Sequence, residues 1–213
     1  MTINIHPILS MPFQENSYVV WREGRSEALV VDPGLEPELI LEFLDARKLR
    51  IAAILDTHGH ADHIAGNGAM KERSPAAPLV IGVKDACMLS DPVLNLSSPF
   101  GLEIFSPPAD RLIVEGDILE YADLRLEVYD IPGHSPGHVV FVLRETPIHV
   151  LGGDVLFAGS IGRTDFPGGS FEQLAMGIRT KLYTLPDDTI IYPGHGPTTT
   201  IGREKRSNQF VRP

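Results

Sequence analysis

One short stretch of the chain carries an unusual density of metal-binding side chains. His58, His60, Asp62 and His63 place three imidazoles and one carboxylate within six residues, although the whole chain has only eight histidines. Neutral imidazole and carboxylate are the ordinary ligands of zinc and of comparable divalent metals. The stretch therefore predicts a metal site rather than a polar loop that holds histidines by chance.

The segments on either side of this stretch indicate how it is positioned. Residues 50–56 form an apolar run with the length of a buried strand, and residues 65–71 read as the start of a helix. The metal-binding stretch is thus predicted to be a strand-to-helix connection, where a rigid scaffold presents side chains to a ligand.

Other predicted strands also end in polar turns that carry a side chain able to bind metal. These turns hold Asp32, His58, His134, Asp154 and His195. Side chains from several strand ends on one rim are how an α/β enzyme builds a site. Five histidines and two aspartates are enough for two metal ions, which a bridging aspartate would hold about 3.5–4 Å apart.

The rest of the pattern predicts an α/β fold in a single domain over residues 1–213. Strands are predicted at 3–9, 16–22, 27–32, 50–56, 78–82, 111–114, 118–122, 124–131, 139–143, 148–151 and 189–192. Helices are predicted at 36–48, 84–90 and 170–182, the last with Ser170 as its N-cap. The tail from residue 201 reads as short and basic.

Residues 91–110 form a long segment rich in proline, glycine and serine. Loops of this length are often lids or binding loops, and a plain surface loop is an equal alternative here. Phe100 and Phe105 in this loop are expected at the substrate entrance. Cys87, just before the loop, is expected to be a small buried residue.

Charge and composition exclude some classes of function. The chain has 18 Lys and Arg against 28 Asp and Glu, a net charge of -10, which argues against nucleic acid as a partner. The single cysteine fits a reducing compartment. No signal peptide or membrane-spanning run is apparent, so we expect a cytoplasmic protein without a membrane partner.

The ligand pattern resembles the metallo-β-lactamase superfamily across essentially the whole chain, including Asp32 in Val-Asp-Pro-Gly. The resemblance implies an αβ/βα four-layer sandwich, with two sheets face to face and helices outside. It also implies two sets of metal ligands: His58, His60 and His134 for the first ion; Asp62, His63 and His195 for the second; and Asp154 between them. Asp32 would orient a ligand imidazole.

Two further segments narrow the resemblance. Residues 152–157 and 162–169 are similar to those of glyoxalase II-like hydrolases and of persulfide dioxygenases, and residues 192–205 look like the short, single-domain glyoxalase II-like proteins. Arg163 matches a basic residue that contacts glutathione in that family. The helical C-terminal domain of full-length glyoxalase II is expected to be absent, since 18 residues follow His195.

The resemblance implies a hydroxyacylglutathione hydrolase-like enzyme that cleaves a small-molecule thioester, of which a glutathione conjugate is one candidate. A hydroxide bridging two divalent ions would attack the carbonyl, with Asp62 as the catalytic residue that orients it. The ions would be zinc or iron, with manganese also compatible. The alternatives are an enzyme for another ester or lactone, a persulfide dioxygenase with one iron on His58, His134 and Asp154, and a non-catalytic sensor.

Overall fold

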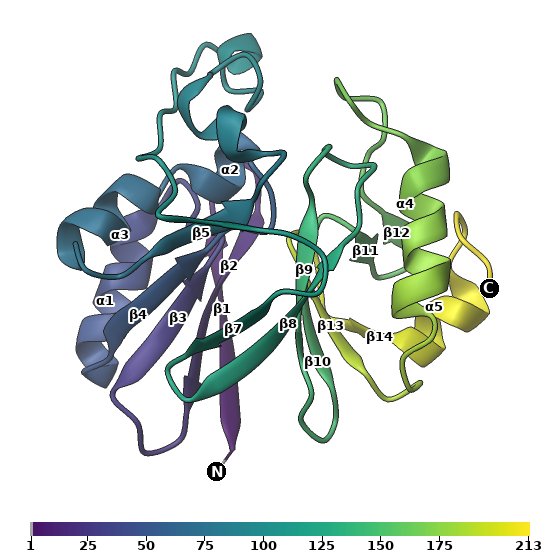
Figure 1. Cartoon of the computed structure of the whole chain (residues 1–213), viewed down its shortest axis with the longest axis horizontal. Coiled ribbons are helices and arrows are strands. Elements are labelled where there is room, and N and C mark those ends of the chain that lie inside the picture. The colour runs from purple at the N-terminus through teal and green to yellow at the C-terminus, as the bar shows by residue number, and fades with distance from the viewer. Residues whose placement is uncertain (1) are drawn as a thin grey trace.

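The computed structural model describes residues 2–213 as two six-stranded sheets that pack face to face, with helices on their outer sides (Figure 1). The first sheet has the order β1-β2-β3-β4-β5-β6, with β1 (Ile3–Ser10), β2 (Glu15–Arg22), β3 (Glu27–Val31), β4 (Arg50–Leu55), β5 (Leu79–Gly82) and β6 (Arg111–Ile113). The second has the order β14-β13-β10-β9-β8-β7, with β7 (Ile118–Tyr121), β8 (Leu124–Asp130), β9 (Val139–Leu143), β10 (His149–Gly153), β13 (Ile190–Pro193) and β14 (Thr199–Thr200).

Helices cover the outer face of each sheet. On the first sheet these are α1 (Pro37–Arg47) and α3 (Asn67–Arg73), and on the second they are α4 (Phe171–Gly177) and α5 (Ile201–Ser207) (Figure 1). The short helix α2 (Ala61–Ile64) lies at one end of the first sheet. This arrangement confirms the predicted αβ/βα sandwich.

Both faces of the central strands are buried, which explains why these strands read as continuous apolar runs. In β9, Phe141 points into the core between the two sheets, whereas Val140 and Val142 point into the core under the helices of the second sheet. In β2, Val20 and Val19 divide in the same way between the central core and the core under α1 and α3. The alternation along each strand therefore fixes the four layers.

The strand directions bring the predicted ligand turns to one edge. β3, β4 and β5 are parallel neighbours in the first sheet. In the second sheet β8 and β10 are both antiparallel to β9, and β13 is parallel to β10, so β8, β10 and β13 run in the same direction. Within each sheet, the turns that follow these strands therefore lie at the same edge.

Several helix boundaries differ from the prediction. The helix predicted to start at residue 65 is α3, which begins two residues later at Asn67, and the short α2 before it was not predicted. Ala65 and Gly66 separate the two helices. A Cβ at Gly66 would lie 2.8 Å from the Gly34 carbonyl oxygen, so glycine allows this close approach. The predicted helix at 170–182 is α4 followed by one π-helical turn, and Ser170 is its N-cap as expected.

Several short elements were not predicted. The basic tail forms α5, and β11 (Leu156–Phe157), β12 (Ser160–Ile161) and β14 have only two residues each, too few to show a periodic pattern. Cys87 was wrongly expected to be buried: it is exposed on the 3-10 helix Ala86–Ser90, whose inner side is formed by Met88 and Leu89.

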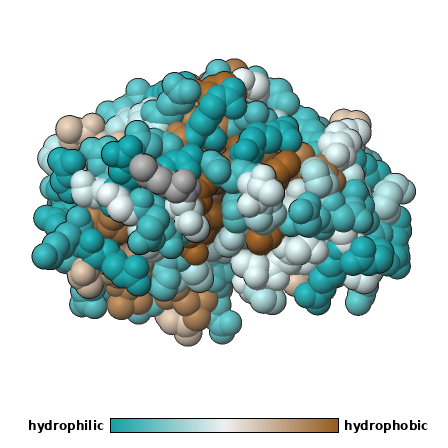
Figure 2. All heavy atoms as spheres, turned by 90° about the horizontal axis from the view of Figure 1, so that it is seen from below, coloured by the Kyte–Doolittle hydropathy of each residue, from teal (hydrophilic) through white to brown (hydrophobic). Residues whose placement is uncertain are grey.

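The face of the molecule seen from below is mainly hydrophilic (Figure 2). Figure 2, which views the molecule from below, shows apolar side chains only in groups between hydrophilic ones. Over residues 2–213, no helix combines the length and the apolar character needed to cross a membrane.

Candidate metal centre

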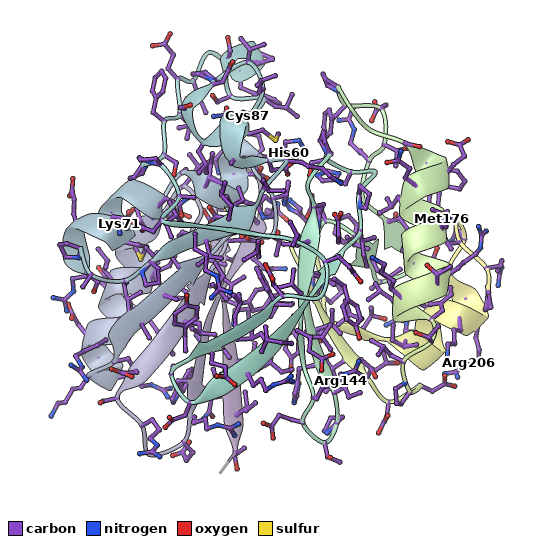
Figure 3. All side chains as sticks on the ribbon, in the orientation of Figure 1. His60, Lys71, Cys87, Arg144, Met176 and Arg206 are labelled. Atoms are coloured by element: carbon purple, nitrogen blue, oxygen red, sulfur yellow. The ribbon has the colours of Figure 1, made fainter. Side chains whose placement is uncertain are left out.

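The structure brings all seven predicted ligands together between the two halves of the molecule. Figure 3 labels His60 at the upper end of this junction, whereas Arg144 at the end of β9 lies at the lower end. Within the described residues, three groups of these side chains have donor atoms within 4.8 Å of one another. They are His58, His60 and His134; Asp62, His63 and His195; and His58, His63 and Asp154. The first two groups coincide with the two predicted ligand sets.

In the first group, three imidazoles point to a common space. His60 Nδ1 lies 2.9 Å from His134 Nε2, and the buried His58 Nε2 has no hydrogen-bond partner. His134 Nδ1 lies 2.9 Å from the Arg163 carbonyl oxygen, to which it donates its proton. That bond leaves the lone pair of His134 on Nε2, on the side where a metal would bind.

The second group is similarly oriented. His195 Nε2 lies 3.3 Å from Asp62 Oδ2, and His63 Nε2 lies 3.8 Å from the same oxygen. On its other side, His195 Nδ1 lies 3.2 Å from the Gln14 carbonyl oxygen, which accepts its proton. Both imidazoles therefore present Nε2 to the Asp62 carboxylate.

Asp154 lies between the two groups. Its Oδ2 is 3.4 Å from His134 Nε2 and 3.7 Å from His195 Nε2, and its Oδ1 is 3.6 Å from His63 Nε2. The Asp154 amide donates a 3.0 Å hydrogen bond to Nε2 of the buried His138. One carboxylate thus faces a histidine of the first group and two of the second, which is the geometry a bridging ligand needs.

Asp32 lies behind the centre and is buried. Its Oδ2 is 3.1 Å from His63 Nδ1, and it accepts hydrogen bonds from the Thr57 amide and hydroxyl, both at 2.7 Å. Thr57 Oγ1 is in turn 3.1 Å from His58 Nδ1. This chain of bonds holds one imidazole from each group with Nε2 facing the centre.

Burial and neighbouring charges shift the pKa values of these histidines. Burial, with the nearby His63, lowers the pKa of His58 well below its ordinary value, so this imidazole is held neutral. Burial also opposes charge on His63, but the carboxylates of Asp62 and Asp154 outweigh it and raise the pKa of His63. The two carboxylates therefore attract positive charge into the centre.

The donor set fits divalent metal ions. His58 Nε2, His63 Nε2 and Asp154 Oδ1 are buried and have no hydrogen-bond partner. Leaving such atoms unpaired costs about 1–3 kcal/mol each, and more for a charged group. These three atoms converge on one space, and cations bound there would give each of them a partner.

Sequence reasoning missed Asp85, which connects the turns of the first group. The buried Asp85 carboxylate accepts hydrogen bonds from the Gly59 amide at 3.2 Å, the Ser135 hydroxyl at 2.6 Å and the Gly137 amide at 2.6 Å. Gly59 lies between two ligands, and Ser135 follows His134. Asp85 comes three residues after β5, so the strand-end rule that found the other acids could have found it.

Asn16 was also missed, and it holds the turn of His195. Its side-chain amide donates to the carbonyl oxygens of Pro193 at 3.0 Å and Gly196 at 2.8 Å, and its backbone amide donates to Gly194 at 2.7 Å. These partners surround His195 on both sides. No sequence signal pointed to them, because the bonds join residues about 180 positions apart.

A cavity of about 340 Å³ opens onto the centre. His60, Asp62, His134, Asp154 and His195 form part of its wall. The long loop 91–110 contributes Leu96, Phe100 and Leu102, and Arg163 also lines the cavity. Phe105 was expected at the entrance, but it is exposed and is not among the residues that line the cavity.

Comparisons with known proteins agree with this geometry. Residues 10–195 match the model of the metallo-beta-lactamase superfamily. Hydroxyacylglutathione hydrolase GloC of Haemophilus influenzae is 40% identical, over 99% of this chain and 98% of that protein. The crystal structure of the BLEG-1 B3 metallo-beta-lactamase is 38% identical with a TM-score of 0.93, over 98% of this chain and 99% of that one. TTHA1623, solved in a di-iron-bound form, is 36% identical with a TM-score of 0.83, over 97% of this chain and all of that one.

Proposed function

The chain belongs to the metallo-beta-lactamase superfamily, and we propose that it is a glyoxalase II-like metallo-hydrolase that cleaves a small-molecule thioester. The observation that carries the proposal is the position of Asp154 between two groups of ligands, on the wall of a cavity large enough for a small substrate. The 40% identity to a hydroxyacylglutathione hydrolase over nearly the whole chain supports a thioester as substrate.

The residues that would hold two ions are those of the two groups. His58, His60 and His134 would hold one ion, Asp62, His63 and His195 the other, and Asp154 would contact both. When bound, such ions polarise a carbonyl oxygen and lower the pKa of water, which makes a nucleophile available at neutral pH. Zinc, iron and manganese all suit these ligands.

The protein's own residues orient the reactants. Asp62 is partly exposed to the cavity, and its carboxylate would accept a hydrogen bond from the attacking water and orient it toward the thioester carbonyl. The hydrogen bonds of His134 to the Arg163 carbonyl and of His195 to the Gln14 carbonyl keep both imidazoles in place. The thiolate leaves readily, so the site needs no strong general acid.

An assay of the metal-loaded protein with S-D-lactoylglutathione and with simple alkyl thioesters tests the proposal. We expect release of free thiol that is abolished by a chelator and restored by added metal. If a protein with both ions bound released no thiol from any of these substrates, the thioester assignment would be wrong, and lactones and other esters would be tested next.

The persulfide dioxygenase alternative uses only His58, His134 and Asp154. It leaves His63 Nε2, which is buried and has no hydrogen-bond partner, without a function. In the two-ion proposal this nitrogen is a ligand of the second ion, and we therefore favour that proposal. Oxygen consumption with glutathione persulfide, by a protein that binds one iron per chain, would instead support the dioxygenase.

A further inference from the structure

The cavity beside the metal centre has largely apolar walls. Away from the metal-binding groups, they are dominated by the rings of Phe13, Phe100, Phe157 and Phe166 and by four leucine or isoleucine side chains, among them Leu102 and Ile161. Phe13 and Phe100, which come from different loops, meet edge to face with centroids 5.3 Å apart. The Phe100 side chain is 65% exposed. Aromatic surface left open beside a cavity is available to an apolar ligand.

The polar side chains of the same walls already have partners within the protein. Asn95 donates to the carbonyl oxygens of Met88 at 3.1 Å and Ile104 at 2.9 Å. Ser97 Oγ accepts a 3.2 Å hydrogen bond from the Ile104 amide. Both side chains are buried, so a ligand could bond to them only by displacing bonds that hold the loop together.

Arg163 is the one lysine or arginine that lines the cavity in the described part of the chain, and its charge is paired. Its Nε and Nη2 donate to the two carboxylate oxygens of Asp165 at 2.9 Å and 2.7 Å. Its guanidinium also lies over the Phe166 ring, 4.4 Å from the centroid. One edge of the guanidinium and one of its faces are thus engaged, in a pair that is exposed to solvent.

A glutathionyl group carries two carboxylates, one ammonium and two amides, and each loses water when it enters a cavity. Burying such groups without new hydrogen bonds is unfavourable. Resting on the proposed thioester hydrolysis, we infer that this cavity selects an uncharged thioester with an apolar, ring-sized group over a glutathione thioester. The apolar group lies against Phe100 and its neighbours, and the scissile carbonyl lies at the metal centre.

Two thioesters with the same acyl group test the inference. The metal-loaded protein is assayed with S-D-lactoylglutathione and with the S-benzyl thioester of D-lactate, each rate being divided by the rate of hydroxide-catalysed hydrolysis. We expect kcat/KM to be at least about tenfold higher for the benzyl thioester, a preference equivalent to about 1.4 kcal/mol. An equal or higher value for the glutathione thioester would overturn the inference and leave the proposed function standing.

Variants locate the source of the preference. Phe100→Ser removes an exposed ring, and we expect it to lower kcat/KM for the benzyl thioester severalfold more than kcat/KM for the glutathione thioester. Phe210→Ser, on the C-terminal tail and also about half exposed, is the matched control and leaves the preference unchanged. Asp165→Asn frees Arg163 and is expected to raise kcat/KM for the glutathione thioester alone. An unchanged preference in Phe100→Ser would contradict the inference.

Binding measurements give a second readout without turnover. Isothermal titration is carried out with the two matching thioethers, in which a methylene replaces the carbonyl. The benzyl thioether is expected to have a Kd at least about tenfold lower than that of the glutathione thioether. Tighter binding of the glutathione thioether would count against the inference, whereas a fully metal-loaded protein that hydrolyses neither thioester would overturn the proposed function and this inference with it.

Discussion

The Ser135 hydroxyl donates a 2.6 Å hydrogen bond to the Asp85 carboxylate, across 50 positions of the sequence. Together with the bonds from the Gly59 and Gly137 amides, it ties two turns that carry the first group of imidazoles to the turn after β5. The hydrogen bonds of the Asp85 side chain go to residues beside the proposed ligands. Its effect on a metal would come from the positions of His58, His60 and His134.

Replacing Asp85 by Asn should therefore weaken the first metal site. The amide nitrogen cannot accept a hydrogen bond, so at least one of Gly59, Ser135 and Gly137 loses its partner. We expect metal affinity at this site to fall by about tenfold to a hundredfold, measured by competition with a chromophoric chelator. Asp123→Asn, on the β7–β8 turn, is the control. An affinity of Asp85→Asn equal to that of this control would show that Asp85 does not position the ligands.

Asn16→Ala should act on the second site instead. It removes two side-chain hydrogen bonds that hold the turn of His195, while the first group stays in place. The metal-binding step that is lost in His195→Ala is expected to lose about tenfold in affinity, with the other step unchanged. Asn4→Ala, which removes an exposed hydrogen bond to Glu23, is the matched control. A selective loss at the step that Asp85→Asn weakens would contradict the role of Asn16 at the second site.

Gly194→Ala should disturb the bridging position. A Cβ at Gly194 would overlap Asp154 Oδ1 and lie 2.7 Å from His63 Cε1, so the alanine must displace a proposed ligand. We expect lower metal occupancy by elemental analysis and a severe loss of activity. Gly68→Ala, where α3 leaves open space for a Cβ, should instead raise the free energy of unfolding by about 0.5–1 kcal/mol and keep full occupancy. Normal metal content in Gly194→Ala would refute the crowding argument.

Asp110 gives a prediction on pH that is independent of the metal centre. The Leu79 amide and the Lys71 ammonium, both 2.8 Å from Oδ2, hold the pKa of Asp110 below its ordinary value of 3.8. A lowered folded-state pKa adds stability above the unfolded pKa, and this stability is lost as the pH falls through the folded one. Asp110→Asn should therefore lower Tm at pH 7, and the difference from the unmodified protein should shrink below about pH 3.8. A difference that stays constant down to pH 2 would argue against this linkage.

Much of the architecture could be predicted from the sequence because the strands are buried on both faces. Segments such as β4 and β9 are continuous apolar runs, and each stops at a glycine-rich or polar turn. Local patterning therefore gave the order of the elements. It did not give the two-residue strands or α5, whose inner side rests on Ile201 and a buried Glu204 rather than on an apolar stripe.

The candidate ligands could be predicted because imidazole and carboxylate at strand ends have few other uses in such number. The supporting residues could not be predicted in the same way. Asn16 acts through hydrogen bonds to the far end of the chain, and a lone asparagine at the start of a strand has no distinctive pattern. Which residues share one edge depends on sheet topology, and periodicity does not encode topology.

The metal content of the purified full chain tests the central claim most directly. Elemental analysis should find about two divalent ions per chain, falling to about one in His195→Ala, because that variant removes a ligand from the second group alone. One ion per chain in both proteins, after incubation with excess metal, would contradict the two-ion centre and with it the proposed mode of thioester hydrolysis.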